Sequence, residues 1–247
     1  MPYLLTFLRI SAFVAFLPPF SGQNIPNLVK EGLAMALTMF WAANAPMEVA
    51  SNIADSWVGL AWYGGREVIL GASLGWLLSL CLTPLRIAGS FLAEELGLTF
   101  ATMTSPLAES GNGNVLSSVF ESFGVLLVFV LNLHLGFLLI FNHFWHVCPV
   151  GGKWDTLASG WVTQAIGSLP AHGISIVAAP AIAMALVLVS ILAIMKQTPQ
   201  FNLFAFGMPY RLAAGLLILV VFLPDVVQSM AHFLKSFVLA PETLLQA

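Results

Sequence analysis

Two adjacent carboxylates, Glu94 and Glu95, are the first candidates for chemistry, because paired acidic side chains can act as general acid and general base. Neighbouring residues on a helix point about 100° apart, so these two cannot flank one substrate atom. We predict no catalytic role for them. Glu94 is expected either to meet a polar group on a neighbouring helix or to line a wet channel, since an unpaired carboxylate in a dry interior costs several kcal/mol.

A metal site can be drawn around His143 and His146, which share a helix face, with Cys148 just beyond them. A fourth ligand is missing, and Phe144 and Trp145 lie among them in a pattern typical of the aromatic belt at a membrane surface. No HExxH, GxSxG or P-loop motif occurs. We therefore predict no metal, no cofactor and no enzymatic activity.

Three more polar residues, Glu121, Asn132 and His134, lie in the apolar run 115–146. Asn132 and His134 could form hydrogen bonds between helices. They could also belong to a proton relay, for which Glu121 is the only titratable partner on the same segment. With Glu94, these residues form our predicted set of intramembrane polar groups, and we favour the hydrogen-bonding role.

The composition identifies a membrane protein or a subunit buried among partners. The chain of 247 residues is 59% hydrophobic and 8% charged, against about 25% charged residues in typical soluble domains. Its mean hydropathy is +0.94. Too few charges are present to cover a water-soluble surface, so we expect contact with membrane lipid.

The charge and the cysteine content argue against a nucleic-acid-binding protein and against a disulfide-linked one. The net charge is -3, and eight Lys and Arg residues form no basic stripe, so nucleic acid is not an expected partner. Cys81 and Cys148 each lie in apolar sequence, which favours two buried thiols over a disulfide.

Apolar periodicity predicts an all-α fold of polytopic, membrane-associated helical hairpins that bend at proline and glycine. We treat residues 1–247 as a single domain. The run 3–17 is expected to be a helix of the mature protein rather than a signal peptide, because no small-residue cleavage pattern follows Arg9. The other expected helical segments are 28–44, 45–65, 66–82, 86–103, 115–146, 154–169, 173–195 and 212–239.

Prolines and glycines divide these segments. We expect a bend or an interruption at Pro84, the end of the interfacial segment 154–169 before Pro170, a kink at Pro180 and a break or a bend near Pro224. Gly71 and Gly75 have the four-residue spacing that favours close helix contact.

A stripe of small residues and a polar loop adjoin one another in the centre of the chain. Gly89, Ala93, Gly97 and Ala101 fall four apart and are predicted to seat the subunit against its neighbours. The helix is then expected to end in a mobile loop that could act as a gate or plug. Its candidate residues are Thr104, Ser105, Pro106, Glu109, Gly111, Asn112, Gly113 and Asn114.

Ordered motifs along most of the chain resemble the FliR/SctT family, the R or T subunit of the type III export gate. Ala88-Gly89, Leu96-Gly97-Leu98, Asn132-Leu133-His134 and the turn at Pro149 and Gly151 match its central patterns. The block 199–209 is the most specific. The family-motif positions at the two ends of the chain are Arg9, Pro18, Pro26, Pro199, Asn202, Phe204, Gly207 and Pro209.

This resemblance implies a non-enzymatic subunit of a helical export-gate ring in the bacterial inner membrane, within the flagellar basal body. The implied partners are FliP/SctR-type and FliQ/SctS-type subunits, a FlhB/SctU-type switch protein and unfolded substrate proteins in transit. Ser105, Glu95 and Lys196 depart from the family pattern. The glycine after Phe206 favours the flagellar branch, and a stand-alone transporter or channel is the alternative.

Overall fold

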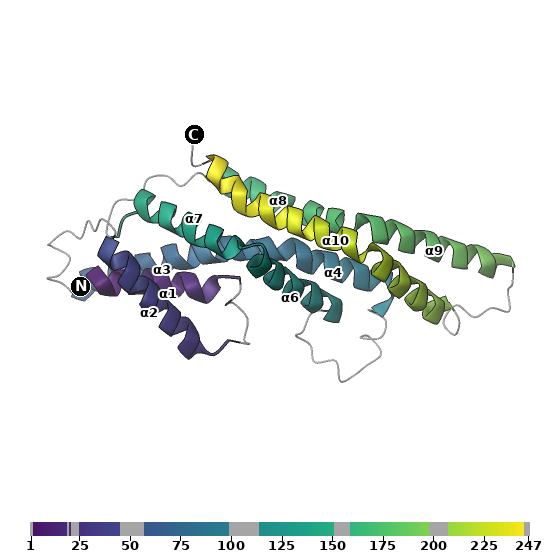
Figure 1. Ribbon diagram of the computed structural model, residues 1–247, viewed down its shortest axis with the longest axis horizontal. Helices are drawn as coiled ribbons and strands as arrows, with labels where there is room; N and C mark the ends of the chain where they lie inside the picture. Colours follow the sequence, from purple (N-terminus) through teal and green to yellow (C-terminus); the bar gives the residue numbers. More distant parts are fainter. Residues whose placement is uncertain are drawn as a thin grey trace. The chain divides into compact units, whose positions relative to one another are not determined.

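The computed structural model describes residues 2–18, 20, 25–44, 57–98, 114–150, 159–197 and 207–244 (Figure 1). Within these residues every regular element is a helix, which confirms the predicted all-α class. In chain order they are α1 (Pro2–Phe16), α2 (Asn27–Asn44), α3 (Trp57–Ser79), the 3-10 turn η2 (Leu80–Leu82), α4 (Thr83–Glu95), α6 (Val115–Val130), α7 (Leu133–Val147), α8 (Ser159–Ile176), α9 (Ala178–Gln197) and α10 (Met208–Leu244).

Contacts divide the chain into two compact units. The first unit comprises Met1–Cys81, Asn132–Ile166 and Phe237–Ala247, and the second comprises Leu82–Leu131 and Gly167–Ser236. Each unit is therefore built from separated stretches of sequence. The assignment of residues 1–247 to a single domain stays a prediction.

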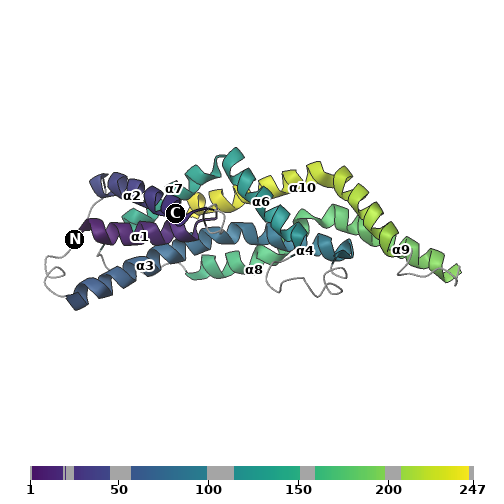
Figure 2. The same ribbon diagram turned by 90° about the horizontal axis from the view of Figure 1, so that it is seen from below.

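In the first unit, α1 lies alongside α3 and also contacts α2 (Figure 2). Two glycines of α3 make the close approach to α1 possible. A Cβ atom on Gly71 would collide with the carbonyl oxygen of Arg9, and one on Gly75 would lie 2.6 Å from that of Phe13. The predicted contact role of this glycine pair is confirmed.

Aromatic rings from three helices complete the core of the first unit. The Phe141 ring centroid lies 4.4 Å from that of Phe13, 5.2 Å from that of Trp41 and 5.6 Å from that of Trp145. Trp41 also donates its indole N–H to the Asn142 side-chain oxygen, at 3.1 Å. This donation supplies a partner for the only polar atom of the Trp41 side chain.

Small residues also mark the contacts of the second unit. A Cβ atom on Gly173 of α8 would lie 2.9 Å from the Ile87 side chain and from the Pro84 carbonyl oxygen of α4. On α10, a Cβ on Gly215 would overlap the Leu96 side chain. Because each site has no room for a methyl group, neighbouring helices approach more closely than larger residues would allow.

The predicted single helix 115–146 was wrong, because the chain breaks at Asn132 between α6 and α7. Asn132 has φ 57°, the left-handed region. Asparagine enters this region more readily than most L residues, since its short polar side chain can bond locally. Periodicity cannot show this break, because the apolar spacing continues on both sides of it.

Three proline or boundary predictions also need correction. A single helix, α3, runs from Trp57 through Arg66, where a boundary was expected. Likewise α8 continues through Pro170. Helix α10 is not broken at Pro224, and a bend there stays a prediction. The predicted segment 173–195 is instead divided by a turn at Val177, so Pro180 lies in the first turn of α9, where its missing N–H leaves no helical bond unmade.

By length and composition, three helical stretches of the described chain can cross a membrane. They are Trp57–Glu95, Ala178–Gln197 and Met208–Val238. The pair α6 and α7 provides a fourth if the two helices count as one broken span. The membrane assignment made from composition is thus matched by helices that are long and apolar enough to span a bilayer.

Candidate functional site

The small-residue stripe of α4 begins in a tight contact with α6 of the same chain. A Cβ atom on Gly89 would lie 2.7 Å from the Ser117 Cα and 2.8 Å from the Leu116 carbonyl oxygen. Ala93, one turn further on, is fully buried. The Gly89 contact is thus intramolecular, and packing of the stripe against neighbouring subunits stays a prediction.

Within the described residues the stripe is interrupted before Gly97, because α4 ends at Glu95. Gly97 has φ 76°, a conformation that glycine adopts without steric cost. Its N–H donates to the Glu94 carbonyl at 3.0 Å, and the Leu96 N–H donates to the Leu92 carbonyl at 2.9 Å. Gly97 is therefore a helix-terminating glycine, and the expectation that α4 extends through it was wrong.

An arginine of α10 binds the carboxyl end of α4. Nε of Arg211 donates to the Glu95 carbonyl at 2.6 Å, and Nη2 donates to the Glu94 carbonyl at 3.4 Å. Nη2 also pairs with the Glu95 carboxylate at 3.3 Å. A cation suits this position, because the last carbonyls of a helix lack intrahelical donors and carry its negative dipole end.

The sequence did not predict the contact between Arg211 and the end of α4, since 116 positions separate Arg211 from Glu95 and no spacing rule relates them. Replacing Arg211 by alanine is expected to destabilise the second unit by about 1–2 kcal/mol, through lost charge-assisted bonds. Hydrogen exchange over residues 92–97, in the detergent-solubilised chain, measures the fraying of α4. Glu95→Gln is the matched control, because it keeps both backbone carbonyls that accept from Arg211. If this control frays as much as the Arg211 variant, the stabilisation comes from the Glu95 carboxylate instead of the carbonyls.

The four predicted intramembrane polar groups have different surroundings. Glu121 accepts from Arg86 through both carboxylate oxygens, at 2.5 and 3.1 Å. Glu94 is exposed and its backbone carbonyl faces Arg211. Asn132 forms the helix break, and His134 is partly buried in α7. Their function in a hydrogen-bonded assembly or in a relay stays a prediction.

A buried ion pair forms the polar centre of the first unit. Arg9 and Glu67 both have fully buried side chains, and Nε of Arg9 donates to Oε2 of Glu67 at 2.5 Å. Nη1 of Arg9 donates to the Cys148 carbonyl at 2.6 Å, and its guanidinium carbon lies 4.9 Å from the Trp145 ring centroid. Helices α1, α3 and the end of α7 therefore meet around the Arg9 side chain.

Arg9 lies in α1, outside the candidate membrane spans. Burial lowers the pKa of its guanidinium, and the nearby charge of Glu67 and the hydrogen bond to it oppose that decrease. Sequence reasoning had singled out Arg9 but missed Glu67. A usable signal existed, because Glu67 is a carboxylate at the centre of an apolar helix and such residues are rarely left without a partner.

Several predicted positions lie outside the described residues. They are the loop residues 104–113, Ala101, Pro199, Asn202 and Phe204. Of the remaining motif positions, Pro26 directly precedes α2, Gly207 is buried, and Pro209 lies in the first turn of α10. Asn114 directly precedes α6 and Pro18 follows α1.

Exposed apolar surface is the main feature that the described residues offer for binding. In the described part of the chain, no group of three or more His, Cys, Asp or Glu residues could hold a metal ion. Large apolar side chains are exposed instead along α9 and the first half of α10, including Ile182, Leu186, Leu217 and Val221. A helix that is apolar on nearly all of its faces buries those faces against lipid or against other protein.

Comparisons with known proteins relate this chain to bacterial export proteins. The sequence model of a family described as bacterial export proteins, family 1, matches residues 1–237. Similar curated proteins, each named flagellar biosynthetic protein FliR, occur in Escherichia coli K12 (27% identity, 95% of this chain and 88% of the relative), Aquifex aeolicus (26%, 99% and 93%) and Bacillus subtilis (24%, 89% and 85%).

Proposed function

This chain belongs to the bacterial export proteins, family 1, and from that membership we infer that it is an export-gate subunit of a flagellar type III secretion system. The observation that carries the inference is the family match over residues 1–237, joined by flagellar relatives aligned over nearly their whole length. Its role is structural: it forms part of the route by which unfolded proteins leave the cell, and it catalyses no reaction.

The partners follow from the same inference. FliP/SctR-type and FliQ/SctS-type subunits would complete the gate with this chain, and a FlhB/SctU-type switch protein would contact it, in the inner membrane at the flagellar basal body. Exposed apolar side chains on α9 and α10 support such assembly, because they provide large surfaces for protein or lipid. The contact at Gly89 supports such packing as well, because it brings the backbones of α4 and α6 close together at a residue without a side chain.

Co-expression tests the proposal. A tagged copy of the chain, solubilised in mild detergent from cells that produce the P- and Q-type subunits, is expected to carry both through two purification steps. The same chain produced alone is expected to accumulate to a lower level, because its apolar surfaces stay uncovered in the cell until detergent is added. Native mass spectrometry gives the subunit composition. A stable, monodisperse monomer that transports a small solute would refute an export-gate role.

A genetic measurement separates the flagellar system from an injectisome. Deleting the gene is expected to abolish secretion of hook and filament proteins, and a plasmid copy should restore it. Normal flagellar export in the deletion strain, with loss of another secreted protein set, would place the chain in the other system.

A further inference from the structure

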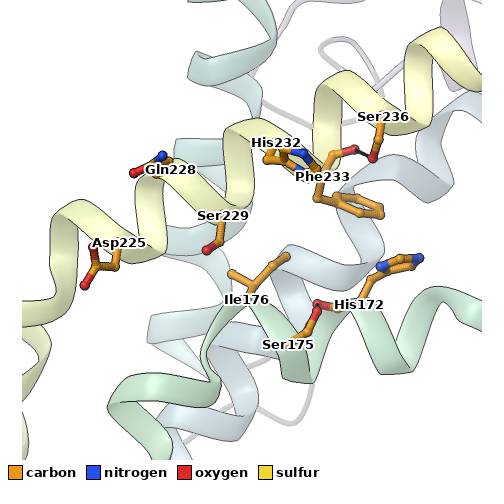
Figure 3. A pocket seen from close by; sticks show the side chains of 9 residues that line it. All are labelled: His172, Ser175, Ile176, Asp225, Gln228, Ser229, His232, Phe233 and Ser236. Carbon is orange, nitrogen blue, oxygen red and sulfur yellow. Dashed lines mark hydrogen bonds between the residues drawn. The ribbon is translucent and has the colours of Figure 1, made fainter.

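A groove of about 600 Å³, most of whose lining residues are of polar types, lies in the second unit between α8 and α10 (Figure 3). His172 and Ser175 line it from α8. From α10 it is lined by Asp225, Gln228, Ser229, His232 and Ser236, while Ile176 and Phe233 supply the apolar part of its surface. This is a concentration of polar groups in a chain with only 8% charged residues.

The groove side of α10 differs from the preceding half of the same helix. Leu217 and Val221 are 69% and 71% exposed, as expected for contact with lipid or an apolar partner. After Pro224, the polar residues 225, 228, 229, 232 and 236 follow at helical spacing and form one continuous face. Both halves belong to the candidate span Met208–Val238.

Most of these polar groups have no partner within the described residues. The Ser175 and Ser236 hydroxyls donate to carbonyls of their own helices, and the His172 ring lies 5.1 Å from that of Phe233. In the described part of the chain, the side chains of Asp225, Gln228 and His232 make no hydrogen bond. Polar groups in a spanning helix face water or a polar partner, because exposure to hydrocarbon is costly.

The volume and the chemistry of the lining both restrict what this face can meet. At about 30 Å³ for each water, the groove of about 600 Å³ has room for roughly twenty waters, which an entering ligand would partly displace. Serine hydroxyls and the glutamine amide each donate and accept hydrogen bonds, and each imidazole carries at least one N–H donor. Asp225 is the only lining residue with a carboxylate or ammonium group. The other polar lining groups are hydroxyls, an amide and imidazoles, so recognition at this groove rests mainly on hydrogen bonds.

We propose that this groove contacts the extended backbone of a polypeptide in transit; the proposal rests on the export function inferred above. An extended backbone offers a donor and an acceptor at nearly every residue, whatever its side chains, and matches a lining of mixed donors and acceptors. A helix fits less well, because its backbone groups are already bonded within it. Ile176 and Phe233 provide apolar contact for passing side chains.

Site-specific photo-crosslinking in the assembled gate tests the contact. A benzophenone amino acid replaces Gln228 or Ser229, and in matched controls it replaces Leu217 or Val221 on the same helix. The probe is a tagged flagellar export substrate halted in transit by a folded C-terminal domain. The groove positions are expected to yield several-fold more adduct with this substrate than the controls, and none once the substrate is released.

Two results overturn the proposal. If the halted substrate co-purifies with the gate but the groove positions crosslink only to another subunit or to lipid, the groove is an assembly surface. If they form no adduct at all, it is not a contact surface for the substrate. Failure of the export function is a separate result: no substrate would co-purify with the chain, and the deletion strain would export normally.

A second measurement avoids the bulky probe. Gln228→Leu is expected to slow export several-fold while the amount of purified gate complex stays unchanged, because the groove loses a side chain that both donates and accepts. Gln228→Asn keeps that chemistry and should retain most of the rate. Equal export by the wild type and by the double variant Gln228→Leu, Ser229→Leu would contradict the proposal.

Discussion

Replacing Arg9 by methionine is expected to lower the free energy of unfolding by about 3–5 kcal/mol, because Glu67 would keep a negative charge in a fully buried site without its partner. The loss also includes the hydrogen bond to the Cys148 carbonyl and the contact with the Trp145 ring. Denaturant unfolding of the detergent-solubilised chain, followed by tryptophan fluorescence, measures the change.

The double variant Arg9→Met, Glu67→Met separates an uncompensated charge from loss of packing. It is expected to be more stable than Arg9→Met alone, since a buried pair exchanged for apolar residues leaves no unpaired charge. Arg9→Lys retains the charge but lacks the planar fork that reaches two acceptors, and should lie between the wild type and Arg9→Met. A double variant as unstable as the sum of both single variants would show that packing dominates.

The second large effect is expected at Gly71, where alanine should cost about 3 kcal/mol, the upper end of typical overpacking. The added methyl group would collide with the Arg9 carbonyl oxygen in the backbone of α1, so a side-chain rotation cannot relieve the clash. Moving α1 away would also disturb the pair that Arg9 makes with Glu67. Thermal unfolding of the purified chain measures the cost.

Gly65 is the matched control on the same helix. A Cβ atom there would meet no other atom within 4 Å, so Gly65→Ala should be neutral or stabilising by up to about 1 kcal/mol, through better helix propensity. Similar destabilisation by the two alanines would mean that helix α1 does not approach α3 at Gly71.

Local patterns predicted the helices better than their ends or contacts. The expected segments 3–17 and 28–44 agree closely with α1 and α2, because apolar runs and the proline before α2 are local signals. The break at Asn132 was not predictable in this way. A left-handed residue interrupts the helix there without interrupting the apolar spacing, and surrounding packing decides whether asparagine adopts that conformation.

The candidate site was predictable only in part, for the same physical reason. The spacing of Gly71 and Gly75 indicated a close contact but not that its partner would be α1. Arg9 was recognisable as a lone charge, whereas its pairing with Glu67 depends on two helices meeting side by side. Gly97 matched the four-residue spacing, yet its positive φ ends α4 instead of extending the stripe.

The Arg9 cluster also imposes an order on events during synthesis. Cys148, whose carbonyl accepts from Arg9, is 139 positions further along the chain. At about 5–20 residues per second, a ribosome makes that stretch in roughly 7–28 s. Glu67 is made much earlier than Cys148, so the new α1 and α3 can neutralise each other's charges first. Trp145 and Cys148 then enclose a pair that already exists, and the Arg9 cluster cannot be completed until more than half of the polypeptide has been made.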